Sequence, residues 1–378
     1  MSNLKCIFHI PGPFSDSPKS GSALRPLMML NAFRQIGYQV TVISGYGTKR
    51  RKLIENIKKE IENGIQYEFL YSESSTMPTA LTEKDHFPRH PWLDFNFFSY
   101  CQNKGIKVGL FYRDIYWKFP IYKENVSLLK RMISIPLYKF DLRNYKKRLS
   151  VCYVPSMKFA KTIGVPLKYK PLPPGSNLNE NFLREKRRRI ETFERKQKLK
   201  IFYVGGVAGL YDITGLMDAV CRLDNVELTV CCQEEEWNAN KQNYQSFSCD
   251  RIKVIHESGE GLKPYYMEAD VSSLYFKKDE YRSFAMPMKL FEYISYGVPI
   301  IATKGTVAQE FISKEEIGWT IDYDANMLMS LLTKLCEKGE EVQKKSINCI
   351  QCAYKNSWEE RAKEVVSDLQ NKKSETVK

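Results

Sequence analysis

The sequence predicts an α/β protein with two doubly wound parallel sheets. A strand, a loop rich in glycine, proline and serine, a helix and a second strand open the chain at residues 4–44. The same order returns at residues 199–232, and each stretch is the start of a βαβ unit. The chain has 378 residues, of which 43 % are hydrophobic, which is enough material for two separate cores. We therefore expect two Rossmann-like domains.

Each expected element follows from its apolar pattern. In the first half, helical periodicity predicts a helix at 23–36, and short apolar runs predict strands at 4–10, 38–44, 65–70, 106–111, 151–154 and 169–172. In the second half, the same criteria predict a helix at 213–223 and strands at 199–204, 226–232, 252–255, 271–276, 298–302 and 319–321.

A proline-rich stretch marks the domain boundary. Residues 171–176 hold three prolines and a glycine, which interrupt regular structure. We therefore expect an N-terminal domain at 1–174 and a C-terminal domain at 175–355. Residues 184–200 are rich in charge and have little apolar periodicity, so a connector is expected there. The tail at 371–378 is expected to be disordered.

The composition indicates a cytosolic protein. No apolar run approaches the roughly 20 residues of a membrane span, and residues 1–10 lack the pattern of a signal peptide. Ten cysteines fit this compartment, because most lie singly in apolar segments and are expected to be buried thiols. Examples are Cys6, Cys152, Cys221 and Cys231.

The positive charge of the chain lies in its first half. Residues 1–180 hold 28 basic and 13 acidic side chains, whereas residues 181–378 hold 30 and 31, for a net charge of +14. Within the basic half, residues 123–147 interleave apolar and basic side chains, which favours contact with an anionic membrane surface. The alternative is a pair of core helices, broken at Pro136, with a solvated basic face. No nucleic-acid motif accompanies the charge, so we expect no nucleic-acid partner.

Residues 286–303 form the most informative segment. Pro287 in the first turn and Gly297 at the end bracket a short predicted helix, and an apolar strand follows. Lys289 and Glu292 are three residues apart, so both project from one side of this helix near its start. A nucleotide sugar needs a cation for its diphosphate, a carboxylate for its ribose diol and helix N–H groups for its phosphate oxygens. The alternative is a surface helix with an i,i+3 ion pair.

This segment resembles the donor-binding segment of GT-B glycosyltransferases, in particular the family 4 enzymes that build bacterial surface polysaccharides. A weaker resemblance covers the chain from Gly21 to the helix at Trp358. It implies two Rossmann-like domains facing across a cleft, a terminal helix at about 356–370 packed on the first domain, and contact of Glu292 with the donor ribose. The implied donor-binding residues are Gly205, Gly206, Arg282, Pro287, Lys289, Leu290 and Glu292.

The glycine-rich loop at 205–209 departs from the family pattern. It follows a strand and precedes a helix, where glycines let a phosphate approach the backbone. A tight strand-to-helix turn is the alternative. Many family members carry Lys or Arg a few residues later, but residues 207–215 contain none, and Tyr211 and Asp212 stand there instead.

A second departure concerns the paired glutamates, eight residues apart, of many family 4 enzymes. Glu292 matches the second, but Phe284 stands at the position of the first. The two departures together leave Lys289, with Arg282 nearby, as the expected cations for the donor diphosphate.

Two segments of the first half supply acceptor-side candidates. Residues 20–25 open the first helix and resemble the loop under the donor-phosphate and acceptor site of these enzymes. There, Gly21 permits close approach and Arg25 complements phosphate charge, unless Arg25 is a surface arginine on a capped helix. Arg113, Asp114 and Tyr116 follow a predicted strand, and ligands of such sheets lie beyond the carboxyl ends of strands.

Asp114 is the candidate for orienting or deprotonating an acceptor hydroxyl. Tyr116 and Trp117 are candidates for stacking on a sugar face, and the alternative is an N-cap aspartate followed by core aromatics. Asp114, Lys289 and Arg25 are therefore the expected catalytic residues. No metal site is expected, because the pairs Cys349–Cys352 and His86–His90 lack further ligands in sequence.

The sequence thus predicts a metal-independent glycosyltransferase without a cofactor. It would move a sugar from a nucleoside-diphosphate sugar to a glycan or lipid-linked acceptor in bacterial surface polysaccharide synthesis. Its place would be the cytoplasm, as a peripheral protein at the inner face of the cell membrane. Two alternatives remain open: a non-catalytic GT-B module that binds nucleotide or glycan beside an active transferase, and a sugar-nucleotide 2-epimerase.

Overall fold

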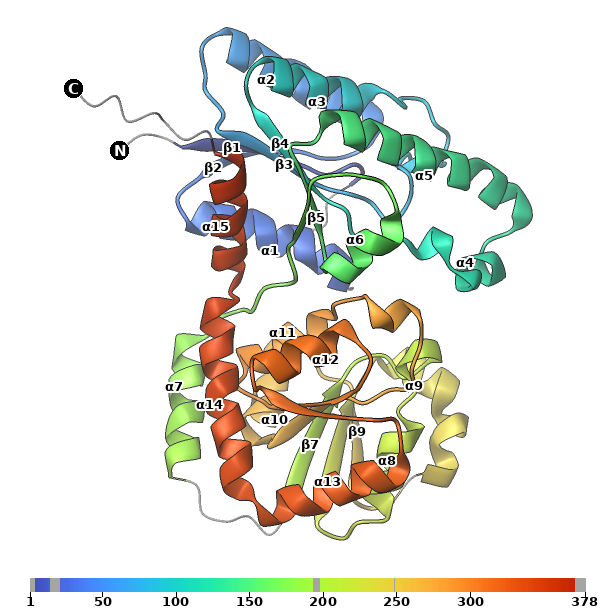
Figure 1. Ribbon diagram of the computed structural model, residues 1–378, viewed down its shortest axis with the longest axis vertical. Helices are drawn as coiled ribbons and strands as arrows, with labels where there is room; N and C mark the ends of the chain where they lie inside the picture. The colour runs from blue at the N-terminus through green and yellow to red at the C-terminus, as the bar shows by residue number, and fades with distance from the viewer. Residues whose placement is uncertain (1–3, 14–20, 193–197, 248, 371–378) are drawn as a thin grey trace, which may run out of the picture. The chain divides into compact units, whose positions relative to one another are not determined.

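The computed structural model describes residues 4–13, 21–192, 198–247 and 249–370 (Figure 1). The predicted disordered tail lies outside these ranges. The chain divides into two compact units. Unit 1 comprises residues 1–174 and 358–378, and unit 2 comprises residues 175–357.

Unit 1 is built on a six-stranded parallel sheet with the strand order β2-β1-β3-β4-β5-β6. Its strands are mostly apolar runs buried on both faces, as parallel sheets require. The order reverses between β1 and β3, so a topological switch point lies there. The strands are β1 (Lys5–His9), β2 (Gln39–Ile43), β3 (Phe69–Glu73), β4 (Lys107–Phe111), β5 (Val151–Val154) and β6 (Tyr169–Pro171).

The last helix of the chain completes unit 1. Helix α15 packs along α1 and against β3 and β4. The contact with β4 is close, because a Cβ added at Gly109 would lie 2.7 Å from a methyl carbon of Leu369. The α-helices are α1 (Gly21–Gln35), α2 (Gly47–Glu62), α3 (Leu93–Asn103), α4 (Pro120–Asn125), α5 (Leu128–Arg148), α6 (Met157–Ile163) and α15 (Trp358–Leu369), with 3-10 turns η1 (Thr79–Leu81) and η2 (Tyr116–Lys118).

Unit 2 holds a second six-stranded parallel sheet with the order β12-β11-β10-β7-β8-β9. Here the order reverses between β7 and β10. The two sheets with their covering helices give the α/β, doubly wound fold class that the sequence predicts. The strands are β7 (Leu199–Val204), β8 (Val226–Cys231), β9 (Ile252–Ile255), β10 (Val271–Leu274), β11 (Ile300–Thr303) and β12 (Gly318–Ile321).

The helices of unit 2 cover both faces of this sheet (Figure 1). The α-helices are α7 (Glu180–Glu191), α8 (Thr214–Cys221), α9 (Glu234–Asn240), α10 (Lys263–Glu268), α11 (Met288–Ser295), α12 (Val307–Lys314), α13 (Ala325–Glu337) and α14 (Gly339–Lys355). The 3-10 turns are η3 (Gly209–Tyr211), η4 (Lys241–Phe247), η5 (Gly259–Leu262) and η6 (Tyr281–Ser283).

The expected connector at 184–200 is wrong for its first part, which belongs to helix α7. This helix buries Phe182, Leu183 and the stem of Lys186. The Lys186 ammonium donates hydrogen bonds of 2.9–3.0 Å to the carbonyls of Tyr266, Met267 and Ala269 at the end of α10. A lysine can therefore serve as a core residue when its charge meets carbonyls that would otherwise lack donors.

The break at Pro136, which belonged to the alternative of two core helices, is not present. Helix α5 runs through this proline, and its first turns are solvent-exposed, where the missing N–H costs little. One further local prediction is wrong. Cys221 is not a free thiol, because it forms a disulfide with Cys249, 28 residues further on. Among the described residues, no helix is both long and apolar enough to cross a membrane.

Candidate functional site

The carboxyl edge of the unit 2 sheet brings several predicted residues together. Open α/β sheets bind ligands beyond the carboxyl ends of their strands at the switch point, which here lies between β7 and β10. Gly205 and Gly206 follow β7, Phe276 follows β10, and helix α11 begins at the same edge. Pro287 is the N-cap residue of α11 and precedes the first turn instead of lying in it.

Helix α11 presents one polar side and buries the other. Leu290 is completely buried in the core, so its side chain is not available to a donor and its predicted role falls to the backbone. Gly297 ends the segment with a left-handed backbone (φ +65°), which glycine adopts without strain. This combination holds the exposed side of α11 in a fixed position over the sheet.

Lys289 and Glu292 lie on the exposed side. The Lys289 Nζ and the Glu292 Oε2 are 3.6 Å apart, and both side chains are about one-third exposed, at 33 % and 34 %. The hydroxyl of the buried Tyr266 donates a 2.8 Å hydrogen bond to Glu292 Oε1. The Tyr266 ring is stacked on Tyr296 with centroids 4.0 Å apart, so this hydroxyl is fixed. The Glu292 carboxylate is therefore oriented from below and remains open to a ligand.

The glycine-rich loop approaches Lys289. A Cβ added at Gly205 would lie 3.3 Å from the Lys289 Cε and 2.8 Å from the Tyr203 hydroxyl, so only glycine fits there without displacement. A Cβ at Gly206 would lie 3.0 Å from Glu236 Oε1, which also accepts a 3.2 Å hydrogen bond from the Val207 N–H. Sequence reasoning missed Glu236. A phosphate at this loop would meet its negative charge, so nearby cations become more important.

Arg282 supplies a cation to the same region from another segment. Its guanidinium carbon is 4.2 Å from the ring centroid of Phe276 and 5.5 Å from that of Tyr211. Among the described residues, no hydrogen-bond partner meets its buried Nη1 and Nη2 atoms. Burial lowers the pKa of this guanidinium. Arg282 thus lies beside Tyr211, in the loop where the sequence lacks a cation.

In unit 1, Arg25 is not a surface residue. The residue is 4 % exposed and its Nε donates a 3.3 Å hydrogen bond to Oε1 of the fully buried Glu73. Arg113 Nη2 lies 3.3 Å from the other Glu73 oxygen, and the Tyr71 hydroxyl donates a 2.7 Å bond to Oε1. The structure therefore brings the predicted Arg25 and Arg113 together through a carboxylate that the sequence did not single out. Gly21 is the first residue of α1.

In the segment after β4, the side chains predicted to contact the acceptor are bonded to or stacked on their neighbours. Asp114 Oδ1 accepts a 2.7 Å hydrogen bond from the Tyr116 N–H, and burial raises the pKa of this carboxyl. The Tyr116 hydroxyl accepts a 2.9 Å bond from Asn125. The Trp117 ring is stacked on Tyr138 with centroids 5.1 Å apart, so that face of the ring is not available to a sugar.

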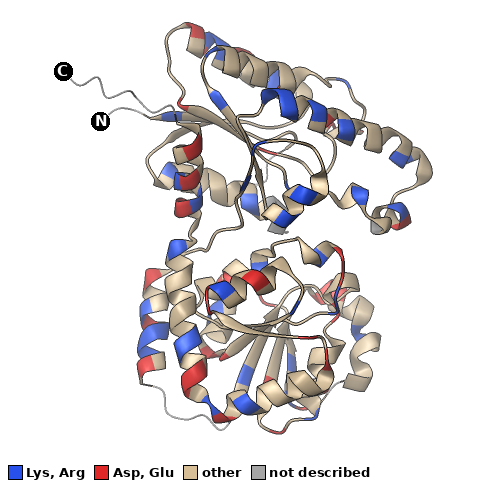
Figure 2. Ribbon diagram, viewed as in Figure 1, with Lys and Arg blue, Asp and Glu red and all other residues tan. Residues whose placement is uncertain are grey.

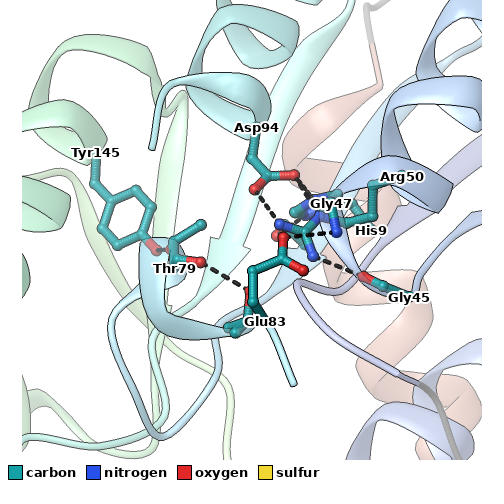
Figure 3. Close-up of polar contacts among 10 residues, drawn as sticks. His9, Gly45, Gly47, Arg50, Thr79, Glu83, Asp94 and Tyr145 are labelled. Carbon is teal, nitrogen blue, oxygen red and sulfur yellow. Dashed lines mark hydrogen bonds and ion pairs between the residues drawn. The ribbon is translucent and has the colours of Figure 1, made fainter. Parts of the chain in front are cut away.

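A buried polar network next to β1 escaped the sequence analysis. His9 contacts Ser72 Oγ at 2.8 Å. It also contacts Asp94 Oδ1 at 2.9 Å (Figure 3). Arg50 pairs with both oxygens of Asp94 at 3.0 Å. Burial alone would raise the pKa of Asp94, but the contacts with His9 and Arg50 outweigh it and lower this pKa to about 2. Ser72, His9 and Asp94 are at most 1 % exposed. This serine–histidine–aspartate arrangement is therefore structural, because no substrate reaches it.

The described part of the chain contains no cluster of three His, Cys, Asp or Glu side chains arranged to hold a metal ion. Cys349 and Cys352 are both buried in α14. His86 contacts the Leu81 carbonyl and His90 contacts Arg51, each at 3.0 Å.

Comparison with known proteins finds a family model that matches part of the chain. Residues 223–357 match the family model of the glucosyltransferase 3-like C-terminal domain. This match lies within unit 2. No curated protein sequence matches the chain. Together with the fold, the family match identifies the class of this enzyme as glycosyltransferase, as predicted from the sequence.

Solved structures give the fold of the whole chain. Sucrose-phosphate synthase from Thermosynechococcus elongatus superposes with a TM-score of 0.61 at 13 % identity, over 97 % of this chain and 98 % of that one. HepE from Anabaena in complex with UDP-glucose gives 0.61 at 12 % identity, over 97 % and 100 %. WaaG, a glycosyltransferase involved in lipopolysaccharide biosynthesis, gives 0.59 at 14 % identity, over 96 % and 99 %. The chain therefore has the GT-B fold.

Proposed function

We propose that this protein transfers a sugar from a nucleoside-diphosphate sugar, bound at the carboxyl edge of unit 2, to a glycan or lipid-linked acceptor in bacterial surface polysaccharide synthesis. The observation that carries the proposal is the group formed by Lys289, Glu292 and Tyr266 beside Gly205. These residues place a cation, an oriented carboxylate and a glycine backbone without a side chain within one small region. The UDP-glucose complex of HepE supports a nucleotide sugar as the donor.

The charges of unit 2 suggest how the donor is activated. Glu292 would accept hydrogen bonds from the ribose hydroxyls, while Lys289 and Arg282 would stabilise the negative charge that grows on the leaving diphosphate. Two cations near one phosphate site can supply the neutralisation that a divalent metal supplies elsewhere, so we propose a metal-independent reaction. On the acceptor side, we propose Asp114 as the group that orients or deprotonates the acceptor hydroxyl, because burial raises the pKa of its carboxyl.

A thermal-shift screen with UDP, GDP, ADP and CMP sugars tests donor binding, since a ligand of the folded state raises its stability. Glu292→Gln should then weaken binding of the best nucleotide by roughly 1.5–3 kcal/mol, the range for hydrogen bonds to a charged group. Glu310→Gln, in the first turn of the neighbouring α12, is the matched control and should bind normally. Unchanged affinity in Glu292→Gln would remove the central residue of the proposal.

The screen also separates the alternative functions. A nucleotide sugar that binds but is neither hydrolysed nor transferred would favour a non-catalytic partner module. Release of a 2-epimeric free sugar together with nucleotide would favour the epimerase. Transfer to a glycan or lipid-linked acceptor is the result expected here.

Unit 1 carries a surface that suits an anionic membrane. Leu128, Leu129, Met132 and Ile133 form one stripe at the start of α5 and are 57–76 % exposed. Basic residues accompany this stripe, and Figure 2 shows Lys and Arg distributed along α5. Exposed apolar side chains flanked by basic ones bind lipid surfaces through combined burial and charge attraction. We propose that this stripe holds the enzyme at the inner face of the cell membrane.

Vesicle co-sedimentation tests the membrane surface. Vesicles of phosphatidylcholine with phosphatidylglycerol should bind the protein, and binding should weaken as salt rises. Leu129→Ser combined with Met132→Ser should abolish most of this binding. Met157→Ser, on α6 and 45 % exposed, is the control and should bind normally. Equal binding to vesicles of pure phosphatidylcholine, or none to either, would contradict this part of the proposal.

A further inference from the structure

Two buried arginines of unit 1 differ in how they are satisfied. Arg50 uses Nε and Nη2 on the two oxygens of Asp94 and Nη1 on the Gly45 carbonyl, at 2.6–3.0 Å (Figure 3). Arg25 uses only Nε, at 3.3 Å from Glu73. Its Nη1 and Nη2 atoms are buried and meet no hydrogen-bond partner within the described residues. The Nη edge of Arg25 therefore makes no hydrogen bond to the described residues, whereas all three guanidinium nitrogens of Arg50 do.

Arg25 also shares its carboxylate with a second guanidinium. One carboxylate, Glu73, serves two guanidinium groups, those of Arg25 and Arg113. The Arg25 guanidinium lies 3.4 Å from the Phe111 ring centroid and 5.7 Å from that of Trp358, so aromatic faces stabilise its charge. They accept no hydrogen bond from the Nη edge in the plane of the group. A buried positive charge with unmade hydrogen bonds is unfavourable unless an anion completes it.

The place of this cluster in the fold is where a ligand would enter. Glu73 and Phe111 are the last residues of β3 and β4, and the strand order reverses next to β3. Ligands of open α/β sheets lie beyond such strand ends. The side chain of Arg113 is 12 % exposed, more than the 5 % of Arg25 and the 0 % of Glu73, so the cluster faces solvent on the Arg113 side.

We infer that the Nη edge of Arg25 binds an oxyanion, a phosphate or carboxylate group carried by the acceptor substrate. The planar fork of a guanidinium matches the two oxygens of such a group, which would accept the hydrogen bonds that the Arg25 Nη atoms do not make within the described residues. The acceptor is then an anionic molecule, and Arg25 positions it. This inference rests on the proposed function for its substrate but not for the anion itself.

Inorganic phosphate is the probe for this site. Saturating phosphate, compared with chloride at equal ionic strength, should raise the unfolding temperature by roughly 2–4 °C, the scale expected for one site in a domain of this size. Arg25→Gln should bind phosphate at least tenfold more weakly. Arg89→Gln removes one exposed charge of the same unit and should retain the full shift, which controls for general salt effects.

Arg25→Lys serves if Arg25→Gln does not fold. It keeps the charge but loses the fork, so circular dichroism should show a folded protein and phosphate binding should still fall about tenfold. A phosphate shift in Arg25→Lys equal to that of the wild type would overturn the inference.

Two further arms identify the source of the anion. In saturating UDP, the phosphate shift should persist, and UDP affinity should be the same in Arg25→Gln and wild type. Weaker UDP binding in Arg25→Gln would assign Arg25 to the donor diphosphate and overturn the acceptor assignment. A wild type without any phosphate shift would overturn the inference. If UDP does not bind at all, the proposed function fails while the phosphate result still reports on Arg25.

Discussion

In unit 1, the charged side chains at the carboxyl edge of the sheet are buried and bonded to one another, whereas the Lys289–Glu292 pair of unit 2 is about one-third exposed. Both units are six-stranded parallel sheets whose order reverses beside the first strand. The topology thus provides the same ligand position twice. The burial of the charged side chains distinguishes the two positions. A buried pair adds rigidity, whereas a pair that is one-third exposed over a glycine loop remains available to a substrate.

The net charges of the units sharpen this contrast. Unit 1 contains 33 basic and 17 acidic residues, and unit 2 contains 25 and 27. Unit 2 is therefore slightly acidic, yet it places Lys289 and Arg282 around its glycine loop. Local placement, and not the average charge of the unit, makes this edge suitable for a diphosphate.

The largest effect is expected on the pH dependence of stability, through the buried Asp141. It would show that buried charge in unit 1 acts on stability. Its Oδ2 accepts a 2.7 Å hydrogen bond from the Thr79 N–H, and burial raises the pKa of this carboxyl to about 7. The folded state then holds a proton that the unfolded state releases near pH ~4, so stability is full below ~4 and is lost as pH rises through ~7. The loss amounts to at most roughly 4 kcal/mol.

Asp141→Asn stays neutral, so it should flatten this dependence and be the more stable protein at about pH 8. Urea unfolding followed by circular dichroism at several pH values measures the change. Asp85→Asn, in an exposed pair with Arg89, should leave the slope in this range unaltered. A wild-type stability that does not fall between about pH 5 and 8 would contradict the prediction. UDP affinity should be the same in all three proteins.

In contrast to Asp141→Asn, which acts on stability, Lys289→Ala should lower turnover with little effect on stability. Negative charge that develops on the leaving diphosphate makes the lysine contact stronger in the transition state than in the ground state. Loss of one preorganised donor lowers turnover by on the order of 10²–10³. Sugar transfer or donor hydrolysis measures this, with Lys304→Ala as an exposed control at the end of β11.

The donor should bind to Lys289→Ala with a smaller loss than turnover shows. Lys289→Arg should recover part of the rate, because a planar fork replaces a point charge. Near-normal turnover in Lys289→Ala, together with an inactive Arg282→Ala, would place the diphosphate contact on η6 and not on α11.

The smallest effect concerns Tyr266, a buried residue that serves an exposed one. Tyr266→Phe removes the hydroxyl that orients Glu292 while the stacked ring remains. Nucleotide affinity should fall by about 0.5–1.5 kcal/mol, or roughly two- to tenfold. Isothermal titration compares it with Tyr265→Phe on the same helix. If Tyr266→Phe lowers the unfolding temperature but leaves affinity unchanged, the hydroxyl is purely structural.

The strands could be predicted because a parallel strand buried on both faces appears in sequence as a continuous apolar run. Strand β3 shows the limit. The predicted strand at 65–70 begins and ends too early, because Ser72 and Glu73 are polar yet fully buried in bonded networks. Helix α7 escaped for a related reason, since Lys186 acts as a core residue. Local pattern does not reveal a polar side chain whose partners lie elsewhere.

The same distinction applies to the site. Lys289 and Glu292 are three residues apart on one helix, so their proximity follows from spacing. Tyr266 lies 26 residues before Glu292, and Glu73 lies 48 residues after Arg25. Such pairs depend on the packing of separate elements, which one sequence without its fold does not specify. Arg282 was found only through the absence of a cation in the glycine loop.

Unit 1 is assembled from two separate segments of the chain, and this affects its biosynthesis. Residues 175–357 form a complete unit whose two ends meet, since the Ser176 N–H donates a 2.8 Å hydrogen bond to the Asn356 carbonyl. Helix α15, whose Trp358 ring lies near the Arg25 guanidinium, is synthesised after residues 175–357. During synthesis, unit 2 can therefore finish folding while residues 1–174 still wait for helix α15.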